Sequence, residues 1–244
     1  VKFWPDRKSL VDKHLARLMA NKNGDILKPD NFAHVSIAVQ GFPALERLLF
    51  AKDAAAALQS NDGPVTPCAV AKAIAVNLHA IATDLEARWT KDPAAGRPAK
   101  RVTTDLFNDL ATGLGAVAEL KLGAPLGSDG KTRPRRAENW MSGHALRNVM
   151  HNLVALQDLY DGLATAKGAH IGKGEDDLIR HQFAYLIKTT RALGPSITAV
   201  LGTEKGPLRL KVLKSDLQDL HELVVINVSE ALDLVLGFNS LDGD

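Results

Sequence analysis

The sequence has little cysteine and little net charge, and each scarcity excludes a class of protein. Cys68 is its single cysteine, which excludes an intramolecular disulfide and a cysteine-based zinc or iron–sulfur centre. Lys and Arg number 30 and Asp and Glu number 28, so the formal net charge of +2 gives no reason to expect a nucleic acid as partner. No apolar run reaches the roughly 20 residues that a transmembrane helix needs.

What remains is the composition of a folded globular protein. Of the 244 residues, 45% are hydrophobic, 24% are charged and 5% are aromatic. A chain of this length buries enough apolar surface to fold without a disulfide or a structural metal. Composition therefore fixes the broad class of the protein, but it does not indicate a function.

The apolar residues recur at a spacing near 3.6, which predicts helices rather than strands. One helix is expected to begin at Thr66-Pro67, with Thr66 as cap, and another at Ser215, where Gln218 completes a capping box. The run from Leu208 to Val212 alternates and predicts one short extended segment or a loop. Helices are expected at about 6–21, 30–60, 67–89, 103–121, 136–166, 175–201 (kinked at Gly194-Pro195) and 216–237.

About seven long helices joined by short turns predict an all-α fold of helical bundles. The most loop-like stretch, 123–134, divides the chain nearly in half. We therefore expect two helical bundles meeting at a cleft, with an N-terminal half over 1–122 and a C-terminal half over 135–244. One long bundle with a hinge also fits the pattern.

Residues 35–50 contain a glycine and a proline inside an otherwise helical pattern. Pro43 lacks an N–H and would clash with the carbonyl of Val39 in a straight helix, so a kink is expected at 39–43. Glu46 lies at the edge of the apolar stripe beside this kink. Freed backbone groups next to a partly buried carboxylate are a candidate site. The alternative is a bent core helix in which Glu46 pairs with an arginine.

The string from Gly41 to Phe50 resembles the imelysin-like family, which carries GxHxxE within a helix. Pro43 takes the place of the histidine in that motif. Three further strings resemble the branch of the family formed by periplasmic lipoproteins: Phe3–Arg7, Trp140–Asn148 and Gly237–Asp244. The resemblance spans most of the chain, and it implies that a helical segment and a leader normally precede Phe3.

The resemblance implies a two-part all-α fold, a periplasmic or outer-membrane-anchored location, and a role in the uptake of iron or another metal. It also carries a peptidase M75 label, with His and Glu as metal ligands. A proline has no lone pair for a metal, and no histidine in this chain has a glutamate three residues later. HExxH is absent from the sequence as well. The resemblance is therefore weaker for the activity than for the fold.

The predicted site is the cleft lined by the kinked segment, the start of the 136–166 helix and the C-terminal tail. Glu46 is the predicted ligand of a divalent or iron ion. Arg7, Arg47 and Arg147 are expected to pair with it or to hold an anionic ligand such as a metal chelate. The full set of predicted cleft residues is Glu46, Arg7, Arg47, Trp140, Ser142, His144, Arg147, Asn148, Asn239 and Asp242.

The leading hypothesis is a non-enzymatic periplasmic binding or accessory protein of iron uptake, with a membrane-anchored uptake protein as partner. One alternative is a metallopeptidase, which needs His79 or His144 to replace the missing histidine ligand. Another is a structural helical module that binds a partner through an exposed apolar face.

Overall fold

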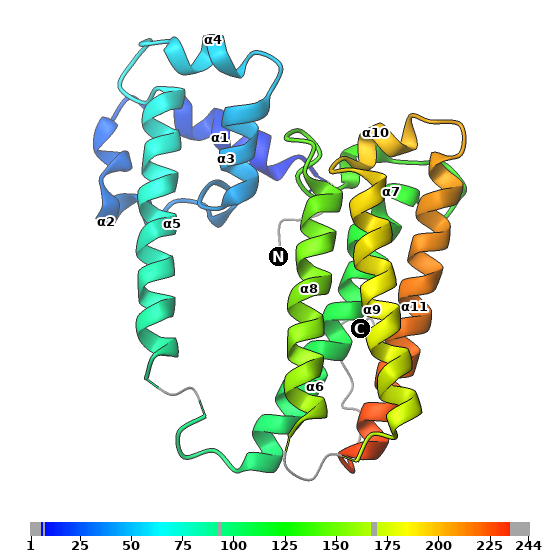
Figure 1. Cartoon of the computed structure of the whole chain (residues 1–244). Coiled ribbons are helices and arrows are strands. Elements are labelled where there is room, and N and C mark those ends of the chain that lie inside the picture. The colour runs from blue at the N-terminus through cyan, green and yellow to red at the C-terminus, as the bar shows by residue number, and fades with distance from the viewer. Residues whose placement is uncertain (1–5, 7, 92–93, 167–169, 235–244) are drawn as a thin grey trace. The chain divides into compact units, whose positions relative to one another are not determined.

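A computed structural model shows the fold (Figure 1) and describes residue 6 and residues 8–91, 94–166 and 170–234. Every regular element in these residues is a helix, so the predicted all-α class is confirmed. The chain divides into two compact units, Val1–Ala95 (unit 1) and Gly96–Asp244 (unit 2).

The boundary between the units differs from the prediction, which placed it in the loop at 123–134. The predicted N-terminal half, 1–122, includes helix α6 (Ala99–Ala116), but α6 belongs to unit 2. The reason is packing, because Phe107, Leu110 and Leu114 of α6 are buried in the core that the later helices form. The predicted halves 1–122 and 135–244 therefore need correction.

Unit 1 consists of short helices packed on the first part of one long helix, α5 (Pro67–Trp89). Helix α5 begins as predicted, since the Ala69 N–H donates to Thr66 Oγ1 at 3.2 Å. Helix α1 is shorter than the predicted 6–21, and Asp6 caps it by accepting from the Leu10 N–H at 2.8 Å. The short helices are α1 (Leu10–Met19), η1 (Gly24–Leu27), α2 (Pro29–Phe32), η2 (Ile37–Val39), α3 (Phe42–Phe50) and α4 (Ala54–Gln59).

The long kinked helix expected over about 30–60 is not present. Four short helices replace it, and α3 begins at Phe42 with Gly41 as its N-cap residue. Pro43 therefore lies in the first turn of α3, where a missing N–H costs nothing because that donor has no partner within the helix. The proline starts a helix here instead of bending one.

Helix α5 is long and apolar enough to cross a membrane, judged by length and composition, with a mean hydropathy of 1.3 over its best window. Lys72 interrupts that window, so no uninterrupted apolar run exists there. The first part of α5 packs in unit 1 through Val70, Ala73 and Ile74. Ile81 and Leu85, on the second part, are exposed within the described residues.

Unit 2 is a four-helix bundle in which neighbouring helices run antiparallel (Figure 1). Its long helices are α6, α8 (Ala145–Ala164), α9 (Lys173–Leu193) and α11 (Gly206–Ala231). Each buries a stripe at helical spacing, such as Leu146, Val149 and Leu153 of α8. Three short helices lie at the end where α8 begins: α7 (Ala124–Leu126), η4 (Pro134–Arg136) and α10 (Ile197–Leu201).

Helix α11 begins ten residues earlier than predicted, and two expectations are wrong as a result. Ser215 lies within the helix and caps nothing, and the alternating run Leu208–Val212 is helical. Pro207 in the first turn favours a helix start here. Likewise, Gly194, with a φ of 90°, ends α9 completely where a kink was expected.

The turn that follows α6 is π-helical and is labelled η3 (Val117–Gly123). It carries the chain past the predicted helix end at 121 and into α7, so the loop begins only after Leu126. Val117, Ala118 and Leu122 of this turn are buried in the core of unit 2. Lys121 of the same turn instead donates hydrogen bonds to Glu138 and Asn152. Such wide turns occur frequently at functional sites.

Candidate functional site

The predicted cleft residues fall into three groups. Glu46 and Arg47 lie on α3 of unit 1. Arg7, Asn239 and Asp242 lie outside the described residues. The remaining five lie together in unit 2, at the start of α8 and in the turn before it: Trp140, Ser142, His144, Arg147 and Asn148.

On α3, Glu46 is half-buried and lies in the second turn of the helix. Its neighbour Arg47 forms an ion pair with Asp12 of α1, so one polar contact joins α3 and α1. Both side chains of that pair are more than a third exposed, so the pair adds little to stability. Arg47 therefore has its ion-pair partner within unit 1. Glu46 supplies the carboxylate of the altered GxHxxE motif.

In unit 2, residues 137–144 form a tight turn (the 137–144 turn) that leads into α8. Asn139 has a φ of 49° and Gly143 a φ of 73°, both in the left-handed region. The Asn139 carbonyl accepts from Ser142 Oγ at 3.2 Å and from the Gly143 N–H at 3.1 Å. These bonds fix the conformation of the turn before α8 begins.

A polar network around Lys121 (the Lys121 network) holds this turn against two helices. Lys121 Nζ donates to Glu138 Oε2 and to Asn152 Oδ1, both at 2.7 Å. Asn148 Nδ2 donates to Glu138 Oε2 at 3.2 Å and to Asn139 Oδ1 at 2.7 Å. The side chains of Lys121 and Glu138 are 18% and 28% exposed, so the pair is well shielded from water.

Sequence reasoning found Asn148 but missed the other members of the Lys121 network. Lys121 comes from the π-helical turn, Glu138 and Asn139 from the 137–144 turn, and Asn152 from α8. Asn148 and Asn152 are four residues apart on one helix, a spacing that places two amides on the same face. That spacing is the one sequence signal that could have indicated Asn152 as part of the site. Lys121 lies 31 residues before Asn152, so it reaches the two amides only in the folded protein.

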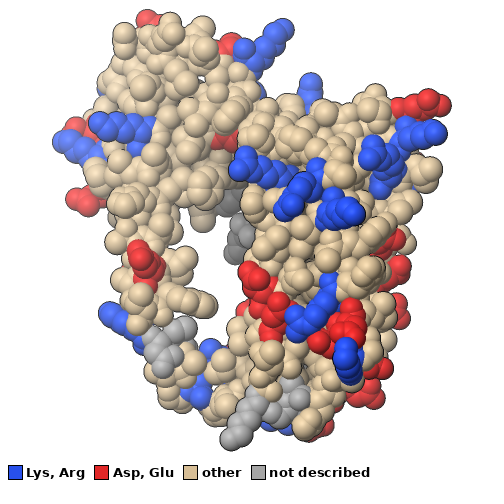
Figure 2. Space-filling model, viewed as in Figure 1, with Lys and Arg blue, Asp and Glu red and all other residues tan. Residues whose placement is uncertain are grey.

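The outer surface of this site is basic. Arg135 stacks over the Trp140 ring at 5.6 Å, and His144 and Arg147 are exposed at the start of α8. Within the described part of the chain, neither arginine has an ion pair. Figure 2 shows basic side chains gathered over the end of unit 2 where α8 begins, with acidic ones farther along the bundle. The site is suited to an anionic group.

A resident metal does not fit the residues that the structure describes. Among them, no group of three or more His, Cys, Asp or Glu side chains lies close enough to hold an ion. In the Lys121 network the oxygen atoms already surround a cation, the Lys121 ammonium. Glu46 as a single metal ligand stays a prediction.

A second polar cluster joins α8 to α9 at the other end of the bundle. The Tyr160 hydroxyl donates to Asp176 Oδ1 at 2.7 Å, and Arg180 pairs with Asp176 and Asp161. Burial, followed by the bond to Asp176, raises the pKa of Tyr160. Burial opposes ionisation of Asp176, but the bonds from Arg180 and Tyr160 outweigh it and lower its pKa. The cluster is internally satisfied, and we assign it a structural role.

Comparison with known proteins gives one match. Residues 1–224 match the family model of imelysin, peptidase M75. Neither the curated proteins nor the solved structures contain a match to the chain. The matched region includes α3 with Glu46 and the whole of the 137–144 turn.

Proposed function

The chain belongs to the imelysin family, and on that premise we propose that it is a non-enzymatic binding protein of iron uptake. Its ligand in this proposal is an anionic metal chelate, bound in unit 2. The family resemblance supports a periplasmic or outer-membrane-anchored location and a membrane-anchored uptake protein as partner. Pro43 supports the non-enzymatic part, because it stands where the family motif has a metal-binding histidine.

The observation that carries the proposal is the basic surface built on the 137–144 turn. Guanidinium groups bind carboxylates through two parallel hydrogen bonds, and Arg135 and Arg147 have no ion pair among the described residues. Glu138, which would repel an anion, is neutralised by Lys121 at 2.7 Å. A rigid turn that presents Arg135 and Arg147, and in which Lys121 neutralises the Glu138 carboxylate, is suited to binding a chelate that carries several carboxylates.

Calorimetric titration with ferric citrate and with citrate alone tests this function. We expect the wild-type chain to bind ferric citrate. Arg147→Gln should weaken binding by about 10- to 100-fold, the value of one or two charge-assisted hydrogen bonds. Arg17→Gln is the matched control, because Arg17 is an exposed arginine of α1 with no ion pair in the described structure. Equal affinities for the wild type and Arg147→Gln would refute the assigned site.

Glu46→Gln tests the metal ligand in unit 1. If Glu46 contributes a carboxylate to an iron or divalent ion, the variant should bind ferrous iron or zinc more weakly than the wild type. Its melting temperature should change little, because Glu46 is only half-buried. Unchanged affinity for both metal ions would show that Glu46 is not a metal ligand.

The family label favours a metallopeptidase as the second candidate. That activity would require His79 of α5 or His144 to act as a ligand, and both are exposed. Cleavage of a denatured protein that stops with a chelator and returns with zinc would establish the enzyme and overturn the non-enzymatic proposal.

A further inference from the structure

Four basic side chains at the end of unit 2 where α11 begins have no acidic partner among the described residues. Arg191 lies in the last turn of α9, Lys205 immediately precedes α11, and Arg209 and Lys211 lie in its first turns. All four are exposed, and no ion pair engages them within the part of the chain that the structure describes. These four residues, with Leu208 and Val212, are called the α11 basic patch below.

The opposite end of the bundle is arranged differently, because its basic side chains are paired. Arg97 and Arg101 both pair with Asp105, Lys173 pairs with Asp177, and Arg180 pairs with Asp161 and Asp176; Lys100 also pairs, with Asp233. At that end of the bundle these basic side chains form ion pairs, whereas the four cations of the α11 basic patch form none among the described residues. Exposed positive charge without an ion pair among the described residues therefore lies at the end of unit 2 where α9 ends and α11 begins, the end that also carries Arg135 and Arg147.

Two apolar side chains lie in the middle of the α11 basic patch. Leu208 is 62% exposed and Val212 is 48% exposed, and their spacing of four places them on one face of α11. At about 100° per residue, Lys205 and Arg209 flank this face on one side and Lys211 on the other. The core side of the same turns is formed by Gly206, Leu210 and Leu213, so the apolar pair is not part of the core.

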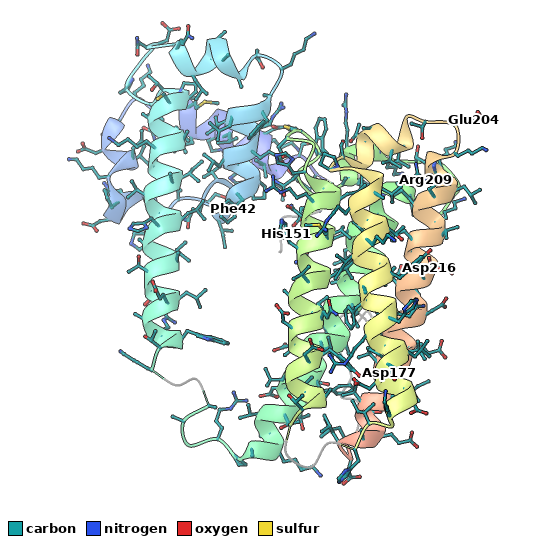
Figure 3. The ribbon with its side chains drawn as sticks, viewed as in Figure 1. Phe42, His151, Asp177, Glu204, Arg209 and Asp216 are labelled. Atoms are coloured by element: carbon teal, nitrogen blue, oxygen red, sulfur yellow. The ribbon has the colours of Figure 1, made fainter. Side chains whose placement is uncertain are left out.

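The charge on this face reverses farther along α11. Asp216, Asp219 and Glu222 follow the basic turns, and the last two are exposed. Figure 3 shows Arg209 near the start of α11 and Asp216 farther along it, with Glu204 in the preceding loop. An anionic surface would therefore attract only the first turns of the helix and would repel the rest.

We propose that the α11 basic patch docks unit 2 end-on against a membrane surface rich in anionic phospholipid. An apolar pair flanked on both sides by Lys and Arg is the arrangement with which a helix binds the interface of such a membrane. The four cations come from two helices and a loop and are exposed, which fits an extended surface better than a small ion. This inference goes beyond the proposed chelate binding, which uses Arg135 and Arg147.

Flotation of the full chain with lipid vesicles tests the docking. Vesicles of phosphatidylcholine are compared with vesicles containing about 30% phosphatidylglycerol. We expect binding to the anionic vesicles alone, and a marked loss of binding between 0.1 and 0.5 M salt, because exposed charges are screened over that range (about 10 Å to under 5 Å of Debye length). Lys205→Gln/Arg209→Gln/Lys211→Gln should lower the partition coefficient by about 100-fold, at roughly fivefold for each charge removed.

Two further variants make the result specific. Leu208→Ser/Val212→Ser keeps the charge and should also weaken binding, which a purely ionic contact would not show. Lys13→Gln/Lys22→Gln/Lys52→Gln removes the same charge from exposed positions of unit 1 and should bind like the wild type. Circular dichroism of each variant checks that the helices remain folded.

Three outcomes would overturn the proposal. Equal binding to both kinds of vesicle would assign the contact to apolar surface, such as the exposed part of α5. Equal losses in the unit 1 control would make net charge the cause. Binding of polyglutamate or duplex DNA without binding of vesicles would assign the patch to an acidic protein or a nucleic acid. Ferric citrate binding is read separately, so either proposal can fail alone.

Discussion

Replacing Lys121 with methionine should loosen the 137–144 turn while leaving the bundle folded. Methionine keeps most of the aliphatic stem of Lys121 and removes only the ammonium, which donates to Glu138 and Asn152 at 2.7 Å. The Glu138 carboxylate then keeps the bond from Asn148 at 3.2 Å and loses its countercharge. The perturbation therefore acts on one polar contact between η3, the turn and α8.

The expected loss of stability depends on how well the Lys121–Glu138 ion pair is shielded from water. Breaking a fully buried ion pair costs about 3–5 kcal/mol, and breaking an exposed one costs about 0–1 kcal/mol. Lys121 and Glu138 are 18% and 28% exposed, which places the pair between these limits. We expect Lys121→Met to lower the free energy of unfolding of unit 2 by about 2 kcal/mol. For a chain of this size that corresponds to a fall of roughly 4–8 °C in melting temperature.

Urea unfolding followed by circular dichroism measures this loss, and a double-mutant cycle isolates the pair. Glu138→Gln should cost less in the Lys121→Met background than in the wild type, with a coupling energy of about 1 kcal/mol. The affinity for ferric citrate should fall as well, because the turn that carries Trp140 is no longer fixed. A loss below about 0.5 kcal/mol with no coupling would refute the idea that this pair holds the site together.

Four further substitutions in unit 2 should change the stability of the protein. Gly206→Ala should destabilise the protein by about 3 kcal/mol, because a Cβ there would lie 1.7 Å from the Val200 carbonyl oxygen; Gly162→Ala, which meets nothing within 4 Å, should stabilise it by about 1 kcal/mol in the same urea experiment. The lowered pKa of Asp176 contributes stability that is fully present above pH 3.8 and is lost as the pH falls through its folded pKa. Asp176→Asn should therefore cost stability at pH 7, and this cost should shrink progressively as the pH falls below 3.8. Burial lowers the pKa of His221, so as the pH falls below about 6.5 the imidazole is protonated in the unfolded chain before it is protonated in the folded chain. The free energy of unfolding should therefore fall between pH 7 and pH 5, and His221→Gln should make that fall smaller.

Local signals in the sequence predicted helices where the cap and the apolar stripe agreed. Helix α5 begins at Pro67 and ends at Trp89 as expected, because Thr66 caps it and no competing signal follows. The prediction was wrong for α11, where a weak capping signal at Ser215 outweighed the stripe formed by Leu210, Leu213 and Leu217. That stripe is buried in the core of unit 2, and tertiary packing decides the helix start.

The site was only partly predictable, for a similar reason. The string Trp140–Asn148 was identified by its resemblance to a family, and five of its residues do lie together before and within α8. Lys121 could not be found in that way, because it is 31 residues from Asn152 in sequence and reaches it only through the fold. Pro43 was given the wrong structural role, since its effect depends on whether a helix starts before it or at it.

The π-helical turn η3 has a consequence for register. A turn of this kind accommodates one more residue than an α-helical turn, and each residue of an α-helix rotates the chain by about 100°. Removing a single residue from 117–120, before Lys121, would restore α-helical hydrogen bonding and rotate everything beyond it by that angle. Lys121 would then turn away from Asn152, so the extra residue sets the direction in which the ammonium points.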